Sequence, residues 1–193
     1  MCPERTSAVL PYRKVVLSSG HMIDTADRPS PRFPPCLEPA VAHEIEAVLD
    51  GWDIGPADLL LLSGARGSDI LFAESGHRRG SHVEIILASP PEVFEQTSVA
   101  LPRSIWSQRF RYLLAHHPYS VSQADGQDGE PNEFARANRA LLRRAEELAP
   151  TAELYVALVW DEQPAGGPGG TGEFAELAMA LDVPLAIINP TKL

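Results

Sequence analysis

Short apolar runs recur along the chain and are separated by stretches of mixed character. Each run is aliphatic and continuous rather than alternating with polar residues, which is typical of strands whose two faces are both covered. We therefore predict five buried parallel strands, at Val15–Leu17, Leu59–Leu62, Val83–Leu87, Leu154–Val159 and Leu185–Ile188.

Between these runs, apolar residues return every three or four positions, which is the spacing of an amphipathic helix. The helical patterns cover residues 37–52, 69–79, 105–116, 134–148 and 174–181. Strands that alternate with helices imply right-handed crossovers, and therefore an α/β fold with a Rossmann-like three-layer α/β/α architecture. We predict one domain over residues 1–193, with a five-stranded parallel sheet in the order 3-2-1-4-5. A ligand should bind at the carboxyl ends of strands one and four, where the strand order reverses.

The composition and charge of the chain limit the classes of partner that it can bind. The chain has 193 residues, a formal net charge of −10 and a pI near 5.0. We expect no nucleic-acid partner, because such sites need clustered Lys and Arg. No apolar stretch approaches the roughly 20 residues that span a bilayer, and the start of the chain lacks a signal-peptide pattern, so we expect no membrane partner and a cytoplasmic location. Cys2 and Cys36 are too few for a disulfide framework or a cysteine-based zinc site, and we expect free, buried thiols. We expect neither a metal nor a cofactor.

A glycine-dense loop, Gly166–Gly172, joins the fourth apolar run to the last helical pattern. Such a loop exposes backbone N–H groups, and the helix that follows points the positive end of its dipole at the same place, so the pattern predicts a phosphate site. The binding residues would be Gly169, Gly170, Thr171 and Gly172. The alternative is a flexible surface loop.

A second loop follows the second apolar run and opens a helix. We expect Gly64, Ala65, Arg66 and Gly67 to contribute to the same anion site, with Arg66 reaching a phosphate. Ser68 or Asp69 could cap the helix. The alternative is a tight strand–helix turn whose glycines only satisfy backbone geometry.

Polar residues also follow the first and fourth strands. Gly20 and His21 end the central strand, and His21 could bind a phosphate or a ribose or merely cap the loop, with Asp24 orienting it. Asp161 could bind ribose hydroxyls or lie in a surface turn. Trp160 is a candidate for stacking on a base, although a core position is the commoner role of tryptophan.

Two motifs resemble known families. Pro168–Glu176 resembles the PGGxGTxxE signature of the "lonely guy" (LOG) nucleotide phosphoribohydrolases, with Glu173 where that pattern has threonine. Ser63–Asp69 resembles the SGGAxGID turn of the DNA-processing protein family DprA/Smf, which shares the Rossmann-like fold. Together with Ser19–Asp24 they indicate a resemblance to the SLOG superfamily, and in particular to its nucleotide-sensor modules of bacterial signalling proteins.

The resemblance implies a LOG-like catalytic glutamate at Glu176 and an arginine on the preceding helix, at Arg139 first and Arg136 second. These would serve N-glycosidic hydrolysis, with the carboxylate stabilising an oxocarbenium-like sugar or activating water. The alternative is structural, because acidic residues in the first turn of a helix favour its dipole by about 0.3–1 kcal/mol.

We therefore expect a nucleotide-binding sensor domain for a nucleotide or an NAD-derived ligand, cyclic ones included. The alternative is an N-glycosidase (hydrolase) acting on nucleoside monophosphates, and a scaffold with vestigial loops comes third. The resemblance also implies a homo-oligomer, for which the apolar side of Ile105–His116 is a candidate surface unless it is buried in the monomer.

Overall fold

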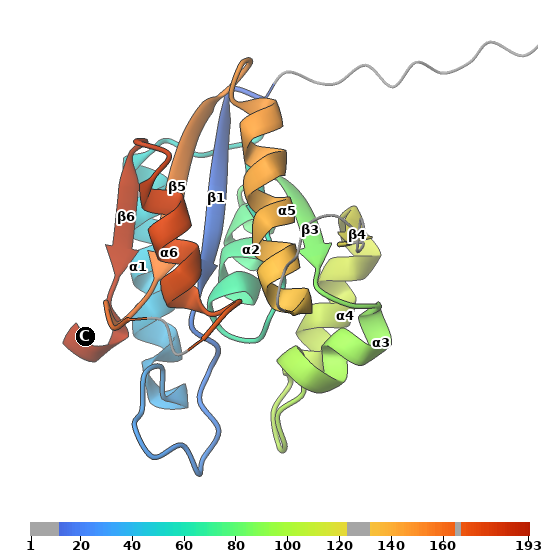
Figure 1. The fold of residues 1–193 in the computed structure, drawn as a ribbon, viewed down its shortest axis with the longest axis vertical. Coiled ribbons are helices and arrows are strands. Elements are labelled where there is room, and N and C mark those ends of the chain that lie inside the picture. Colours follow the sequence, from blue (N-terminus) through green and yellow to red (C-terminus); the bar gives the residue numbers. More distant parts are fainter. Residues whose placement is uncertain (1–11, 123–131, 165–166) are drawn as a thin grey trace, which may run out of the picture.

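A computed structural model describes residues 12–122, 132–164 and 167–193 of the chain. A parallel sheet crosses its middle in the order β4-β3-β2-β1-β5-β6 (Figure 1). The five predicted strands are present with the predicted neighbours, but the predicted count of five was wrong. The added strand is β4, a three-residue edge strand that pairs with β3 through its main chain. The strands are β1 (Lys14–Gly20), β2 (Leu59–Leu62), β3 (His82–Leu87), β4 (Tyr119–Val121), β5 (Glu153–Val159) and β6 (Leu185–Ile188).

Helices cover both faces of the sheet. In Figure 1, α5 and α6 lie in front of it, whereas α1 and α2 lie behind. The short α3 continues into a π-helical turn at Glu95–Val99, and neither was predicted. The helices are α1 (Glu38–Gly51), α2 (Ser68–Arg78), α3 (Pro91–Phe94), α4 (Trp106–His116), α5 (Glu133–Leu148) and α6 (Thr171–Met179), with 3-10 turns at Pro35–Leu37 and Pro190–Lys192.

The continuous apolar strands fill two separate cores, because successive side chains of a strand point to opposite faces. On β1, Val16 joins the cluster that packs against α1, α2 and α4. Its neighbours Val15 and Leu17 join the cluster under α5 and α6. The fold is therefore the three-layer α/β/α arrangement that the runs predicted.

The apolar side of helix α4 packs inside the monomer. Its apolar residues Trp106, Phe110 and Leu113 are buried in the core cluster of α1 and α2. The candidate oligomer surface on this helix is therefore occupied by the chain's own core, although Ile105 just before it is exposed.

Other expectations have mixed outcomes. Cys36 is exposed rather than buried, and Cys2 lies outside the described residues. None of the helices in the described ranges is long and apolar enough to cross a membrane.

The central pair of strands determines where the loops leave the sheet. β1 pairs with β5 over its full length, with Gly20 opposite Val159. A Cβ at Gly20 would lie 2.5 Å from the carbonyl oxygen of Val159, so only glycine fits this close approach. The N–H of His21 then donates to that carbonyl at 2.8 Å. The segments after β1 and β5 consequently leave the sheet side by side.

Candidate functional site: a cavity at the carboxyl edge of the sheet

A cavity of about 640 Å³ opens at the carboxyl ends of β1, β2 and β5, which is where the reversal of strand order predicted a ligand. Its walls come from the loop after β1, the segment after β5, the glycine-dense loop, α5 and the π-helical turn. The lining residues include Gly20, His21, Arg28, Arg32, Ala65, Asp69, Phe94, Thr97, Ser98, Phe134, Asn138, Trp160, Asp161 and Gly169–Gly172.

A buried histidine–aspartate pair joins the two central strands at the cavity. The Nε2 atom of His21 lies 2.8 Å from Oδ1 of Asp161, and the imidazole is only 2% exposed. Burial lowers the pKa of His21 more than the hydrogen bond with Asp161 raises it, so the ring is neutral near pH 7. Asp161 keeps a lowered pKa, because the contact with His21 and a backbone N–H outweigh its own burial. The sequence analysis proposed that Asp24 orients His21. The structure shows that the partner of His21 is Asp161 instead.

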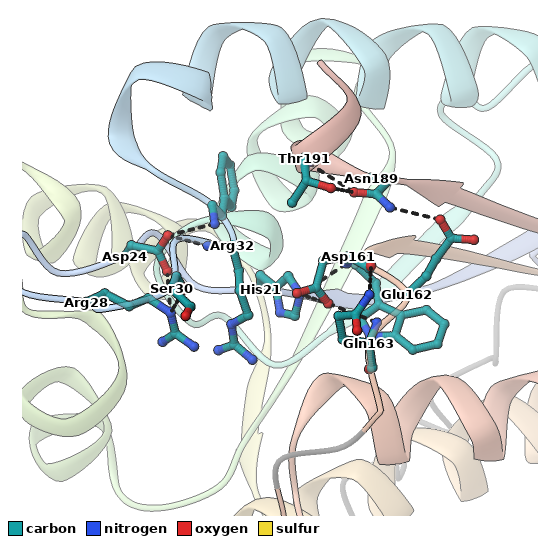
Figure 2. A network of polar contacts seen from close by, with 12 residues as sticks. His21, Asp24, Arg28, Ser30, Arg32, Asp161, Glu162, Gln163, Asn189 and Thr191 are labelled. Atoms are coloured by element: carbon teal, nitrogen blue, oxygen red, sulfur yellow. Dashed lines mark hydrogen bonds and ion pairs between the residues drawn. The ribbon is translucent and has the colours of Figure 1, made fainter.

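Asp24 instead fixes the loop that carries two arginines. Its Oδ2 atom accepts the N–H groups of Arg32 and Phe33, both at 2.8 Å, and Oδ1 forms an ion pair with Arg28 at 3.1 Å. Figure 2 shows the guanidinium groups of Arg28 and Arg32 pointing in the same direction from this loop. Burial and the neighbouring Arg28 lower the pKa of Arg32, although it stays charged. Both guanidinium groups line the cavity, and although Asp24 pairs with Arg28, each can donate hydrogen bonds to an anion.

The glycine-dense loop lies on α5 and opens α6. A Cβ at Gly169, which has a φ of +82°, would lie 2.6 Å from Cβ of Phe134, so the loop requires glycine here. The N–H of Gly169 donates to Glu173 Oε2 at 2.5 Å and is therefore already occupied. The N–H groups of Thr171 and Gly172 begin α6, whose N-cap, Gly170, supplies no side-chain hydrogen bond. Gly166 lies outside the described residues.

The loop after β2 is closed by its own carboxylate. Asp69 Oδ2 accepts the N–H groups of Gly64 at 3.0 Å and Ala65 at 3.1 Å. Burial raises the pKa of Asp69 to about 6, and those two hydrogen bonds offset only part of the effect. Arg66 is buried and its Nε donates to the carbonyl of Ile23, so it holds the β1 loop rather than lining the cavity. At Gly67 the β2 loop packs closely against the segment after β1. A Cβ there would lie 2.6 Å from the backbone nitrogen of Ile23, so this contact requires glycine.

The helix α5 presents an amide to the cavity where an arginine was predicted. Asn138 is 9% exposed, and its Nδ2 has no hydrogen-bond partner in the described part of the chain. Arg139 is exposed on α5, and Arg136 Nε contacts the carbonyl of Ser122 at 3.4 Å. Glu176 is exposed on α6. Neither Arg139 nor Glu176 is among the described residues that line the cavity.

Among the cavity residues that were not proposed from the sequence are Arg28, Arg32 and Asn138. The two arginines had a usable signal, since they lie in the proline-rich stretch directly after the central strand. Asn138 had none, because one amide on an amphipathic helix resembles any other polar surface position.

Comparison with known proteins adds distant likenesses of fold. No protein-family model and no curated protein sequence matches the chain. The X-ray structure of DNA processing protein A (DprA) from Streptococcus pneumoniae aligns with 94% of this chain, at 12% identity and a TM-score of 0.43. The chain spans 60% of that protein's chain. The Moco carrier protein from Chlamydomonas reinhardtii aligns with 93% of this chain and 91% of its own, at 12% identity and a TM-score of 0.36. The strand order and the two helical layers make this chain Rossmann-like.

Proposed function

We propose that this protein recognises a small phosphate-bearing ligand, a nucleotide or an NAD-derived compound, in the cavity at the carboxyl edge of the sheet. The observation that carries the proposal is the convergence of Arg28, Arg32 and the first N–H groups of α6 on one cavity. Positive groups at this place are notable in a chain with a net charge of −10. Guanidinium groups and the N-terminus of a helix are the donors that phosphate prefers.

The polar donors at the other walls support the same ligand. Asn138 Nδ2 is a buried donor without an acceptor among the described residues, and leaving such a group unpaired costs about 1–3 kcal/mol. A bound ligand with oxygen acceptors would remove that cost. The roles of Gly169, Gly170, Thr171 and Gly172 in this site remain predictions, with the N–H of Gly169 available only if Glu173 releases it.

The size and the apolar walls fit a nucleotide. A cavity of about 640 Å³ lies within the roughly 300–1,000 Å³ range of small-molecule sites. Phe134 and Trp160 give it aromatic surface. The indole Nε1 of Trp160 donates to the carbonyl of Gln163 at 3.1 Å, which holds the ring at the end of β5. A base could stack on such a ring.

Recognition is supported over N-glycosidic hydrolysis by the state of the carboxylates. Asp69 and Asp161 line the cavity, and each already accepts hydrogen bonds from the protein. Glu176, which the LOG resemblance proposes as the catalytic carboxylate, is exposed outside the cavity lining. The hydrolase therefore stays the second hypothesis, and the SLOG-sensor resemblance agrees with the first.

Calorimetric titration with AMP, ADP, cyclic AMP, NAD and ADP-ribose tests the proposal. We expect at least one of them to bind, and we expect Arg32→Ala or Arg28→Ala to weaken binding about tenfold to hundredfold, because each removes a charge-assisted contact. Arg78→Ala is the matched control, since it removes one surface guanidinium that pairs with Glu46 outside the cavity. Binding by none of the compounds would overturn the proposal.

Turnover is measured in the same samples by chromatography. We expect the bound nucleotide to remain intact. Release of free base that disappears in Glu176→Gln would overturn recognition without hydrolysis and establish the second hypothesis. Self-association is a separate prediction, and light scattering that finds only monomer would contradict it.

A further inference from the structure

The His21–Asp161 pair fixes the tautomer of a buried imidazole. The 2.8 Å contact between Nε2 and the carboxylate Oδ1 requires a proton, and the carboxylate has none to give because its pKa is lowered. The proton therefore resides on Nε2. The opposite tautomer would set a nitrogen lone pair against a carboxylate oxygen at that distance, which the weaker 3.2 Å contact from the N–H of Asp161 would not offset.

With the proton on Nε2, the other ring nitrogen is an acceptor. Nδ1 of His21 is buried and has no hydrogen-bond partner in the described ranges. His21 is also among the residues that line the cavity, and Nδ1 is its ring nitrogen that contacts neither the carboxylate nor the N–H of Asp161. Figure 2 shows the imidazole between Asp161 and Arg32. The charge of Arg32 also contributes to the lowered pKa of His21, so the guanidinium and the imidazole face the same region of the site.

We propose that Nδ1 of His21 accepts a hydrogen bond from a ligand hydroxyl, and that the cavity thereby selects ribose-bearing phosphates over their deoxyribose counterparts. This inference rests on the proposed function and names the part of the ligand that His21 reads. A phosphate oxygen carries only lone pairs at neutral pH and would face the lone pair of Nδ1, so the phosphate belongs with Arg28, Arg32 and the amides of α6. A hydroxyl is the group of a nucleotide's sugar that can donate to Nδ1.

The discrimination follows from burial. When the ligand lacks the hydroxyl, the buried Nδ1 stays unpaired, and the cost of an unsatisfied buried acceptor is not recovered. We expect about a tenfold to hundredfold loss of affinity for the deoxy compound. A site that merely tolerated the sugar would show no such difference.

The test compares AMP with 2′-deoxy-AMP, with 3′-deoxy-AMP and with the fluoro analogue of whichever position matters. If another nucleotide of the first panel binds better, its own deoxy and fluoro analogues are used. Fluorine replaces the hydroxyl without supplying a proton, so we expect it to bind as weakly as the deoxy compound. Equal affinities for the ribo and deoxy ligands would overturn this inference and leave the proposed function standing. Binding of no nucleotide would overturn both.

Variants separate the tautomer from mere packing. Asp161→Asn can donate its amide proton to Nε2, which moves the imidazole proton to Nδ1 and should abolish most of the discrimination while the arginine contacts keep the phosphate. Glu162→Gln is the matched control, because it makes the same change one residue later, in a side chain that pairs with Asn189 and Lys192. NMR of the imidazole nitrogens in the unbound protein gives an independent readout. A proton found on Nδ1 at neutral pH would overturn the inference.

Discussion

Asp69 gives a sharp test of how this site is built, because its carboxylate is buried and pairs with no cation in the described part of the chain. The side chain is 4% exposed, and its hydrogen-bond donors are the N–H groups of Gly64 and Ala65 and the hydroxyl of Ser68. Asp69→Asn keeps an acceptor oxygen for the two backbone donors and removes the buried charge. We therefore expect the variant to be more stable than the wild type at neutral pH, although it changes a cavity residue.

The magnitude comes from the pKa. Burial raises the pKa of Asp69 from 3.8 to about 6. One pH unit is worth about 1.4 kcal/mol, so ionised Asp69 costs about 3 kcal/mol at pH 7. Between pH 3.8 and 6 the folded protein holds a proton that the unfolded chain has released, so this contribution makes stability fall as pH rises through that window. For a domain of this size the gain corresponds to about 6–12 °C in Tm.

Thermal and urea unfolding of both proteins at pH 4 and pH 7 measures the effect. The variant should gain little at pH 4 and nearly the full amount at pH 7. Asp58→Asn is the contrasting control: Asp58 is also buried, but Arg13 donates two hydrogen bonds to it and its pKa is lowered, so the amide should destabilise at pH 7. An Asp69 variant that is less stable at pH 7, or equally shifted at both pH values, would refute the reasoning.

Three further predictions concern the loops and the surface. Gly169→Ala should cost about 1–3 kcal/mol in urea unfolding and weaken nucleotide binding, because its Cβ collides with α5, whereas Gly51→Ala meets nothing within 4 Å and should be neutral. Arg109→Met should cost about 2 kcal/mol, since it leaves two half-buried carboxylates unpaired, while Arg111→Met removes an exposed pair and should change the unfolding free energy little. His117 has a pKa lowered by burial and by two neighbouring histidines, so protonation below about pH 6.5 should destabilise the fold. The loss of stability between pH 7 and pH 5.5 should be smaller in His117→Gln. An unchanged loss would mean that groups other than His117 cause it.

Much of the fold could be predicted because its strands are buried on both faces. A run such as Leu59–Leu62 has no polar residue, and few arrangements other than the interior of a parallel sheet accommodate it. The edge strand β4 could not be predicted in this way. Its three residues are exposed or half-buried, so it exists through main-chain hydrogen bonds to β3 that leave no trace in side-chain pattern.

The site was less accessible to sequence reasoning than the fold. Glycine loops and His21 could be placed at the correct edge of the sheet because strand ends define that edge. Partners could not: Asp161 lies 140 positions from His21, whereas Asp24 lies nearby in sequence and was chosen for that reason. The amides of the β2 loop looked available to a ligand, yet the buried Asp69 occupies two of them. Which backbone N–H groups are already hydrogen-bonded within the protein depends on tertiary packing, which the sequence pattern does not reveal.

The pairing of β1 with β5 has a consequence for how the chain is made. Emerging from the ribosome, β1 meets its partner β2 within about 45 residues, but its other edge stays open until residues 153–159 have been synthesised. While residues 63–152 are being synthesised, the nascent chain therefore carries a central strand with one open edge, which invites pairing with other chains. Over the same interval, the loop that carries Arg28 and Arg32 lacks the residues after β5 that form the opposite wall of the cavity. A nucleotide could accordingly assist folding only after the glycine-dense loop has left the exit tunnel.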